Sequence, residues 1–307
     1  MAPQTTLSPR AWTEMMALAL IWGASFLAMR IALDEIGPLT AVSHRVVWAA
    51  LLLWVWVWLR GYALPRGAAI WIGFLGMGIL NNAIPFTLMA WGQLHIPTGL
   101  TAILNAATAI FGVIAAAIFF ADERLTLRRA AGVLLGFAGV TTAIGPGALL
   151  SFDVTSLAQL AVIAGTVSYA LAGVWARKRL RGLRPEVAAA GMLTVSSVVM
   201  LPLAWAVEGR PSLDLRPETW AAIGYFAVVA TALAFLLYYR VLAMVGAGNL
   251  MLVTLLIPPV AIVLGAWVRD EALSGRAYAG FAVLALGLAL LDGRILARRA
   301  QDRPRRA

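Results

Sequence analysis

The stretch Asp122-Glu123-Arg124-Leu125-Thr126-Leu127-Arg128-Arg129-Ala130-Ala131-Gly132 occurs a second time, slightly changed, as Asp270-Glu271-Ala272-Leu273-Ser274-Gly275-Arg276-Ala277-Tyr278-Ala279-Gly280. The copies are 148 residues apart, close to half of the 307-residue chain. Each lies between two long apolar runs, and its Thr126 or Ser274 is placed to cap the next helix by accepting from exposed backbone N–H groups. We interpret the pair as a duplicated hinge between helices.

The duplication extends outward from this hinge. At nearly the same offset Ile72-Gly73-Phe74 is echoed by Ile223-Gly224-Tyr225, and Gly139 by Gly287. A shared register across separate echoes is typical of an internal repeat. The sequence therefore predicts two homologous halves, residues 12–145 and 156–293, followed by a basic tail at 294–307.

The composition indicates a membrane protein. The chain is 62% hydrophobic and 12% charged, and its apolar runs are near the length that crosses about 30 Å of hydrocarbon. Ten spans are predicted: 12–33, 39–59, 68–91, 96–120, 127–144, 157–176, 187–207, 219–239, 246–268 and 277–291. With no cysteine and only His44 and His95, disulfides, thiolate metal sites and histidine clusters are excluded. We expect no metal and no cofactor.

The net charge of +10 is distributed unevenly. With the N-terminus in the cytoplasm, 18 of the 24 basic residues lie in the inner segments, whereas the outer loops hold four: Arg210, Arg216, Arg269 and Arg276. The positive-inside rule then places both termini in the cytoplasm. Basic charge here sets orientation and does not indicate nucleic-acid binding. We expect a multi-pass protein of a bacterial-type inner (plasma) membrane.

Five spans per half is an odd number, so the second half enters the membrane upside down relative to the first. The predicted fold class is an all-α membrane protein with ten transmembrane helices arranged as two inverted five-helix repeats. Inverted repeats are a transporter architecture, in which one half moves against the other around a central site.

Several short motifs carry a family resemblance. They are Ile21-Trp22-Gly23-Ala24-Ser25-Phe26, Pro38, Arg45, Ala121-Asp122-Glu123-Arg124-Leu125-Thr126 and, in the second half, Asp270-Glu271-Ala272-Leu273-Ser274 with Gly280 and Gly287. Through these residues the chain resembles two EamA domains of the drug/metabolite transporter superfamily, and within it the YddG-type exporters of aromatic amino acids. The resemblance implies ten helices, both termini inside and export of small metabolites.

Polar residues at membrane depth are the candidate substrate ligands, since they are costly there unless they face a cavity or another helix. Thr98, Thr101, Asn105, Thr108 and Gly112 follow spacings of three and four, which places them on one helical face. Asn81 and Asn82 lie near the middle of the third span, before Pro85, whose missing N–H leaves a carbonyl free. Interhelical hydrogen bonding is the alternative role for these residues.

Aromatic residues at depth suit a ligand with a ring, although core packing would also explain them. The complete candidate substrate-binding set is Trp22, Ser25, Phe26, Asn81, Asn82, Pro85, Phe86, Thr101, Asn105, Thr108, Ser168, Tyr169, Thr231, Phe235, Tyr238, Tyr239, Thr254 and Pro258.

Prolines inside the spans are candidate gating hinges, with static kinks as the alternative. Pro258 and Pro259 should interrupt or kink the ninth span, and no proline occupies the matching place in the fourth. Likewise, the position in the eighth span that is equivalent to Pro85 of the third span is occupied by Ala234.

Ionisable residues are scarce at depth. Arg30, His44 and Arg45 lie near Asp34 and Glu35, so pairing or snorkelling would satisfy them. Arg45, which matches the family pattern, could equally have a functional role. No aspartate or glutamate lies at the centre of any span, so the sequence offers no evident group to bind and release a proton.

These observations favour a transporter over an intramembrane enzyme or sensor, because an enzyme needs a nucleophile with a base, or paired aspartates, at depth. Amide, hydroxyl and aromatic groups suit a zwitterion or a neutral solute. We therefore predict alternating-access export of small net-neutral metabolites, foremost aromatic or other neutral amino acids, by an uncoupled facilitator; export of drugs or other metabolites, or proton coupling, is the alternative. We expect a monomer in the lipid bilayer, with a dimer as the alternative.

Overall fold

The computed structural model describes residues 8–121, 126–145, 153–180, 182–250 and 252–292, and the elements in these ranges are helices. In chain order they are α1 (Pro9–Ala32), α2 (Pro38–Leu59), α3 (Ala68–Met77), η1 (Gly78–Ala83), α4 (Ile84–Gln93), α5 (Thr98–Asn105), α6 (Thr108–Phe119), α7 (Leu127–Ile144), α9 (Val154–Arg179), α10 (Pro185–Glu208), α11 (Pro217–Gly224), η2 (Tyr225–Leu233), α12 (Ala234–Leu250), α13 (Leu252–Arg269) and α14 (Gly275–Asp292). The elements η1 and η2 are π-helical.

The helices have the length and apolar character of membrane spans. Within the described ranges, eight helical segments are long and apolar enough to cross a membrane, and two shorter apolar helices, Leu256–Arg269 and Gly275–Leu290, accompany them. Their limits agree with the predicted spans except between the eighth and ninth. We predicted that the ninth span begins at residue 246, whereas α12 continues to Leu250 and α13 begins at Leu252.

Both predicted hinge caps are confirmed. The Thr126 hydroxyl accepts from the backbone N–H of Arg129 at the start of α7, at 3.3 Å. In the second copy the Ser274 hydroxyl accepts from the backbone N–H of Ala277 at the start of α14, at the same distance. The two hinges therefore begin equivalent helices.

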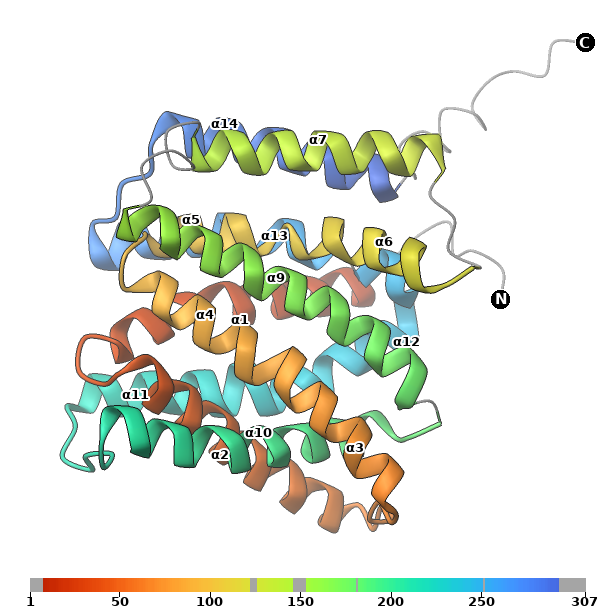
Figure 1. Cartoon of the computed structure of the whole chain (residues 1–307), viewed down its shortest axis with the longest axis vertical. Helices are drawn as coiled ribbons and strands as arrows, with labels where there is room; N and C mark the ends of the chain where they lie inside the picture. Colours follow the sequence, from red (N-terminus) through yellow and green to blue (C-terminus); the bar gives the residue numbers. More distant parts are fainter. Residues whose placement is uncertain (1–7, 122–125, 146–152, 181, 251, 293–307) are drawn as a thin grey trace, which may run out of the picture.

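Those two helices, α7 and α14, pack on each other along one side of the molecule, at the top of Figure 1. Glycine makes the contact: a Cβ atom added to Gly139 would collide with the backbone of Gly280 and Leu284, and one added to Gly280 would collide with Ala143 and Gly139. Close backbone approach at small residues is a common basis of helix association in membranes. The repeated glycines thus pack across the two halves in a crossed arrangement, Gly139 on Gly280 and Gly287 on Gly132.

On the opposite side, α2 packs against α10, again joining the two halves. The Ser43 hydroxyl donates to the carbonyl oxygen of Met200 at 3.0 Å, and the Trp54 indole N–H donates to the Thr194 hydroxyl at 2.6 Å. Interhelical hydrogen bonds of this kind satisfy polar groups that lipid cannot.

The π-helices interrupt equivalent spans. Within η1 the ladder runs to the fifth preceding residue, as from the Ile84 N–H to the Ile79 carbonyl. The next bond would join Pro85 to Leu80, but proline has no N–H. The Ser168 hydroxyl of α9 donates to that freed Leu80 carbonyl at 2.7 Å. This confirms that Pro85 frees a carbonyl.

The second half bends its backbone in the same way without a proline. Segment η2 ends at Leu233, directly before Ala234, the residue equivalent to Pro85, and within η2 the Thr231 hydroxyl donates to the Phe226 carbonyl at 2.7 Å. Single-turn π segments within helices occur frequently at functional sites. The asymmetry that the sequence suggested at this position is therefore absent from the backbone.

Pro258 and Pro259 do not interrupt the ninth span, so of the two predicted effects only a kink stays a prediction. Helix α13 continues through Pro258 and Pro259, whereas the fourth span, which has no proline between Thr98 and Phe119, breaks at Ala106 and Ala107. The break is a tight turn in which Ile110 N–H donates to the carbonyl of Ala107, three residues before it, at 2.9 Å. Helices broken at depth are typical of transporter binding sites.

Candidate functional site

The two asparagines of η1 face α10. Asn82 is fully buried, and its amide nitrogen donates to the Ser196 hydroxyl at 3.0 Å. Ser196 in turn donates to the carbonyl of Gly78 at 3.0 Å, where the π segment begins. Asn81 lies beside them, with its amide nitrogen 3.4 Å from the Asn82 side-chain oxygen. For Asn82 the structure shows the alternative role, an interhelical hydrogen bond; a substrate contact stays a prediction.

A cationic group lies at the junction of α2, α4 and η2. The Arg45 Nε–H donates to the Thr231 hydroxyl at 2.9 Å, and the guanidinium carbon lies 4.0 Å from the centroid of the Phe86 ring. The Phe86 ring meets that of Tyr169 edge to face, at 6.4 Å between centroids. Of the alternatives for Arg45, pairing with Asp34 or Glu35 is not seen in the described residues, because its contacts come from η2 and α4; a functional role stays a prediction.

An aromatic row starts from the same segment, η2. The Trp22 indole N–H donates to the carbonyl of Ala230 at 3.2 Å, and its ring lies 5.7 Å from that of Tyr238. The ring centroids of Tyr238 and Tyr239 are 5.1 Å apart, and Tyr239 stacks on Phe235 with 6.4 Å between ring centroids. Since Ala230 and Thr231 are consecutive, η2 positions both the aromatic row and Arg45.

The polar stripe of the fourth span is divided by the helix break. Thr101 donates to the carbonyl of Pro97 at 3.2 Å, and Thr108 to the carbonyl of Asn105 at 2.7 Å, so both hydroxyls bond within their own span. The Asn105 side-chain oxygen differs: it is buried and has no hydrogen-bond partner in the described residues. A buried amide oxygen without a partner costs free energy unless a ligand or water satisfies it.

The remaining candidates lie around Trp22. The Ser25 hydroxyl donates to the carbonyl of Trp22 at 2.7 Å, within α1. The Phe26 carbonyl accepts from Gln93 at 2.8 Å, a contact that the sequence analysis did not identify. Thr254 and Pro258 lie on α13 next to Val253 and Ile257, which belong to the same apolar cluster as Trp22, Phe26 and Tyr238.

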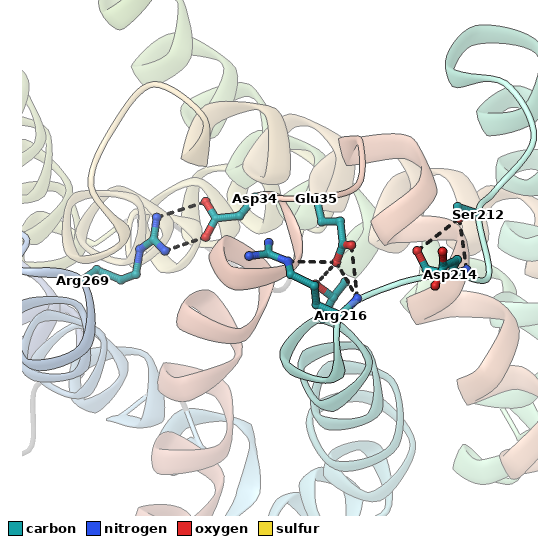
Figure 2. Close-up of polar contacts among 7 residues, drawn as sticks. Asp34, Glu35, Ser212, Asp214, Arg216 and Arg269 are labelled. Atoms are coloured by element: carbon teal, nitrogen blue, oxygen red, sulfur yellow. Dashed lines mark hydrogen bonds and ion pairs between the residues drawn. The ribbon is translucent and has the colours of Figure 1, made fainter.

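Carboxylates gather at one end of the bundle, on the turns at 33–37, 209–216 and 270–274, at the left of Figure 1. We call it the Asp34 end. Figure 2 shows Asp34 held by Arg269 from α13, at 2.5 and 3.1 Å, and Asp34 also pairs with Arg30 at 2.7 Å. The expected pairing of Arg30 is confirmed. His44 instead accepts from the Trp48 indole N–H at 3.2 Å.

Glu35 links α1 to α11. It accepts hydrogen bonds from the backbone N–H of Arg216, at 3.1 and 3.2 Å, and from the Thr219 hydroxyl (Figure 2). The Thr219 hydroxyl and then the Arg216 backbone hold the pKa of Glu35 below its ordinary value, against an opposing effect of burial. Burial would raise the pKa of Asp34, but hydrogen bonds and charges from Arg269 and Arg30 outweigh it and lower the pKa.

Two further glutamates cap helices from a distance. Glu208 accepts from the backbone N–H groups of Leu39 and Thr40 at the start of α2, at 2.9 and 2.8 Å. Glu271 accepts from the N–H and the hydroxyl of Thr98 at the start of α5, each at 2.8 Å. From the sequence we expected Glu271 and its equivalent Glu123 each to support its hinge through a neighbouring arginine; Glu271 instead bonds to Thr98, and Glu123 lies outside the described residues.

In the part of the chain that the structure describes, no hydrogen bond or ion pair joins a carboxylate to η1, to η2 or to Arg45. Glu14 lies in the second turn of α1, where it pairs with Arg240 at 2.7 Å and with Arg10 at 3.1 Å. The side chains shown in contact with η1 and η2 among the described residues include amides, hydroxyls, aromatic rings and the guanidinium of Arg45. Such a set can bind a neutral or zwitterionic solute that carries an apolar group.

Sequence reasoning left two residues out of the candidate set that the structure places here. Arg45 was noted, but its position near Asp34 and Glu35 in the sequence pointed to them as partners. Ser196 gave no signal, because its partner Asn82 lies 114 residues away. Only the folded chain brings these pairs together.

The comparisons with known proteins agree along the chain. The model of the "EamA-like transporter family" matches twice, over residues 13–145 and 156–291. A crystal structure that aligns with 94% of this chain and 99% of its own, at 20% identity, has a TM-score of 0.68, which supports the fold alone.

Curated relatives cover most of the chain. Protein PagO of Salmonella typhimurium is 26% identical over 90% of this chain and 90% of its own length. A probable terminal-alkyne amino-acid exporter of Streptantibioticus cattleyicolor is 26% identical over 96% and 97%. The uncharacterized inner membrane transporter YedA of Escherichia coli K12 is 25% identical over 90% and 88%.

Proposed function

Because this chain belongs to the EamA-like transporter family, a family of membrane transporters, we propose that it exports small net-neutral metabolites, foremost neutral amino acids with an aromatic or other apolar side chain. The substrate would bind near η1 and η2, where the two halves meet. Export of drugs or other metabolites is the second candidate, since the aromatic row would also suit a neutral ring compound.

One observation carries the substrate class. Segment η1 carries the amides of Asn81 and Asn82, and η2 contacts Trp22 and the Arg45 guanidinium, while Glu14 pairs with arginines near the start of α1 and Asp34 lies on a turn. A permanent cation would need a carboxylate at depth, and a phosphate ester several basic groups. A solute that carries an apolar group and no net charge needs neither a carboxylate at depth nor several basic groups. The amino-acid exporter of Streptantibioticus cattleyicolor adds support from a relative.

We propose ten spans with both termini in the cytoplasm, so that the Asp34 end faces outward. Transport would then alternate between an open and a closed Asp34 end, with ion pairs such as that of Asp34 with Arg269 holding it closed. The π segments and the break at Ala106 and Ala107 would be the flexible points, since their backbone hydrogen bonding already departs from the α-helix.

We further propose facilitated movement down the solute gradient. Proton coupling requires a group that binds and releases a proton in each cycle. The spans offer no central aspartate or glutamate for that purpose.

Flux from proteoliposomes tests both the substrate class and the absence of proton coupling. Vesicles with the purified protein are loaded with a mixture of labelled amino acids, and efflux is compared with that from protein-free vesicles. Selective efflux of neutral amino acids is expected; efflux equal to the protein-free control for every amino acid would refute the substrate class. Accumulation driven by an imposed pH difference, and abolished by a protonophore, would instead establish proton coupling.

A further inference from the structure

We propose that Arg45 binds the carboxylate group of the transported solute, which assigns the substrate class to carboxylate-bearing compounds. The inference rests on the proposed function, because it concerns the same site. It starts from a guanidinium that the fold fixes in place without using its two terminal nitrogen atoms.

Two contacts hold the Arg45 side chain. Its Nε–H donates to the Thr231 hydroxyl at 2.9 Å, and its guanidinium lies over the ring of Phe86 at 4.0 Å. Both neighbours are themselves held: Thr231 is 1% exposed and Phe86 is 9% exposed. The guanidinium is therefore fixed at one edge and over one face.

The terminal nitrogens of Arg45, Nη1 and Nη2, make no hydrogen bond to the described residues. Arg45 makes its one hydrogen bond in the described structure through Nε. The side-chain atoms that are both fully covered and unpaired in the described residues are His44 Nε2, Asn105 Oδ1 and Gln159 Oε1, so each terminal nitrogen of Arg45 keeps some surface that protein atoms do not cover. Parallel N–H groups of this kind match the two oxygens of a carboxylate.

Charge balance supports the same conclusion. An arginine stays protonated in proteins and, at membrane depth, is normally paired with an acidic group. Three arginines at span ends are paired in this way: Arg30 and Arg269 share Asp34, and Arg240 pairs with Glu14. Among the described residues no carboxylate pairs with Arg45, so the solute can supply the missing counter-ion.

The surroundings fit the rest of such a solute. Tyr169 meets the Phe86 ring at 6.4 Å, and the aromatic row begins one residue from Thr231, at the carbonyl that Trp22 contacts. A carboxylate on Arg45 would leave an apolar substituent beside these rings. A role for Arg45 as a tie between α2 and η2 alone would leave the terminal nitrogens without a purpose.

The experiment compares phenylalanine with phenylalaninamide, which lacks the carboxylate, as competitors of labelled phenylalanine flux through the full chain in proteoliposomes. The wild type should prefer phenylalanine at least about 10-fold, as expected for hydrogen bonds between charged groups. In Arg45→Gln the preference should fall to near unity. Arg45→Lys keeps the charge but loses the paired donors, so an intermediate preference is expected.

Arg30→Gln is the matched control, because it removes a paired arginine of α1, and it should keep the wild-type preference. Equal competition by the two compounds in the wild type would overturn the proposal whatever the variants do. Reduced flux in Arg45→Gln or Arg45→Lys with an unchanged preference would show a structural role and also overturn it. Absence of amino-acid flux in the wild type would instead refute the proposed function.

Discussion

Glu271 and Thr98 form a double hydrogen bond between the two halves: one carboxylate oxygen accepts from the Thr98 backbone N–H and the other from its hydroxyl, each at 2.8 Å. The carboxylate lies at the N-terminus of α5, where the helix dipole favours negative charge. A residue of the second hinge therefore stabilises the start of a helix in the first half.

Replacing Glu271 with Gln should lower stability by about 1–3 kcal/mol, because the charge and one acceptor are lost at the helix end. Thermal unfolding of the purified protein in detergent measures this. Glu218→Gln is the control, since Glu218 is exposed in the first turn of α11. Equal losses in both variants would contradict a specific cap.

Replacing Gly139 with Leu should separate α7 from α14 and sharply reduce folded yield. A Cβ atom at that position would collide with the backbone of Gly280 and Leu284, which cannot move aside as a side chain can. Yield after gel filtration is the measurement. Gly173→Leu on α9 serves as the control, because nothing lies within 4 Å of its added Cβ. Wild-type yield of Gly139→Leu would disprove the close packing.

Asn82 and Asn105 should respond differently to truncation. Asn82→Ala removes the bond to Ser196 and should lower thermal stability, by roughly 1 kcal/mol or more. Asn105→Ala removes an unpaired oxygen, so stability should hardly change while flux falls several-fold. Melting temperature and flux are measured on the same samples. Normal flux of Asn105→Ala would remove Asn105 from the substrate site.

Acidification should weaken the ion pairs that Asp34 makes with Arg30 and Arg269 and so lower the stability of the protein. The pKa of Asp34 is lowered in the folded protein, so its stabilising effect is present above the ordinary aspartate range and is lost as pH falls through the lower, folded value. Below about pH 4 the wild type should therefore lose melting temperature faster than Asp34→Asn. Asp214→Asn is the control at the same end, because Figure 2 shows only its backbone bonded to Ser212. Parallel pH profiles of wild type and Asp34→Asn would contradict this role.

Single cysteines test the inverted topology, since the natural chain has none. Arg128 and Arg276 occupy equivalent places in the two hinges, and both are exposed. Arg128→Cys should react with an impermeant thiol reagent only from the cytoplasmic side, and Arg276→Cys only from outside. Reaction of both from one side would refute the inversion.

The sequence by itself determined what depends on neighbours along the chain. Apolar runs of spanning length fixed the helices, and the caps at Thr126 and Ser274 followed from hydroxyls placed three residues before the N–H groups they accept from. The freed carbonyl at Leu80 also followed, because a proline's missing N–H acts within one helix turn.

Tertiary structure decided the partners. The pairs Arg45 with Thr231 and Glu271 with Thr98 lie 186 and 173 residues apart, and nothing local indicates either. The break at Ala106 and Ala107, and the continuity of α13 through Pro258, likewise reversed the expectation from proline content. The physical reason is that a polar group inside a membrane must find its partner within the protein, and only packing of the two halves brings that partner near.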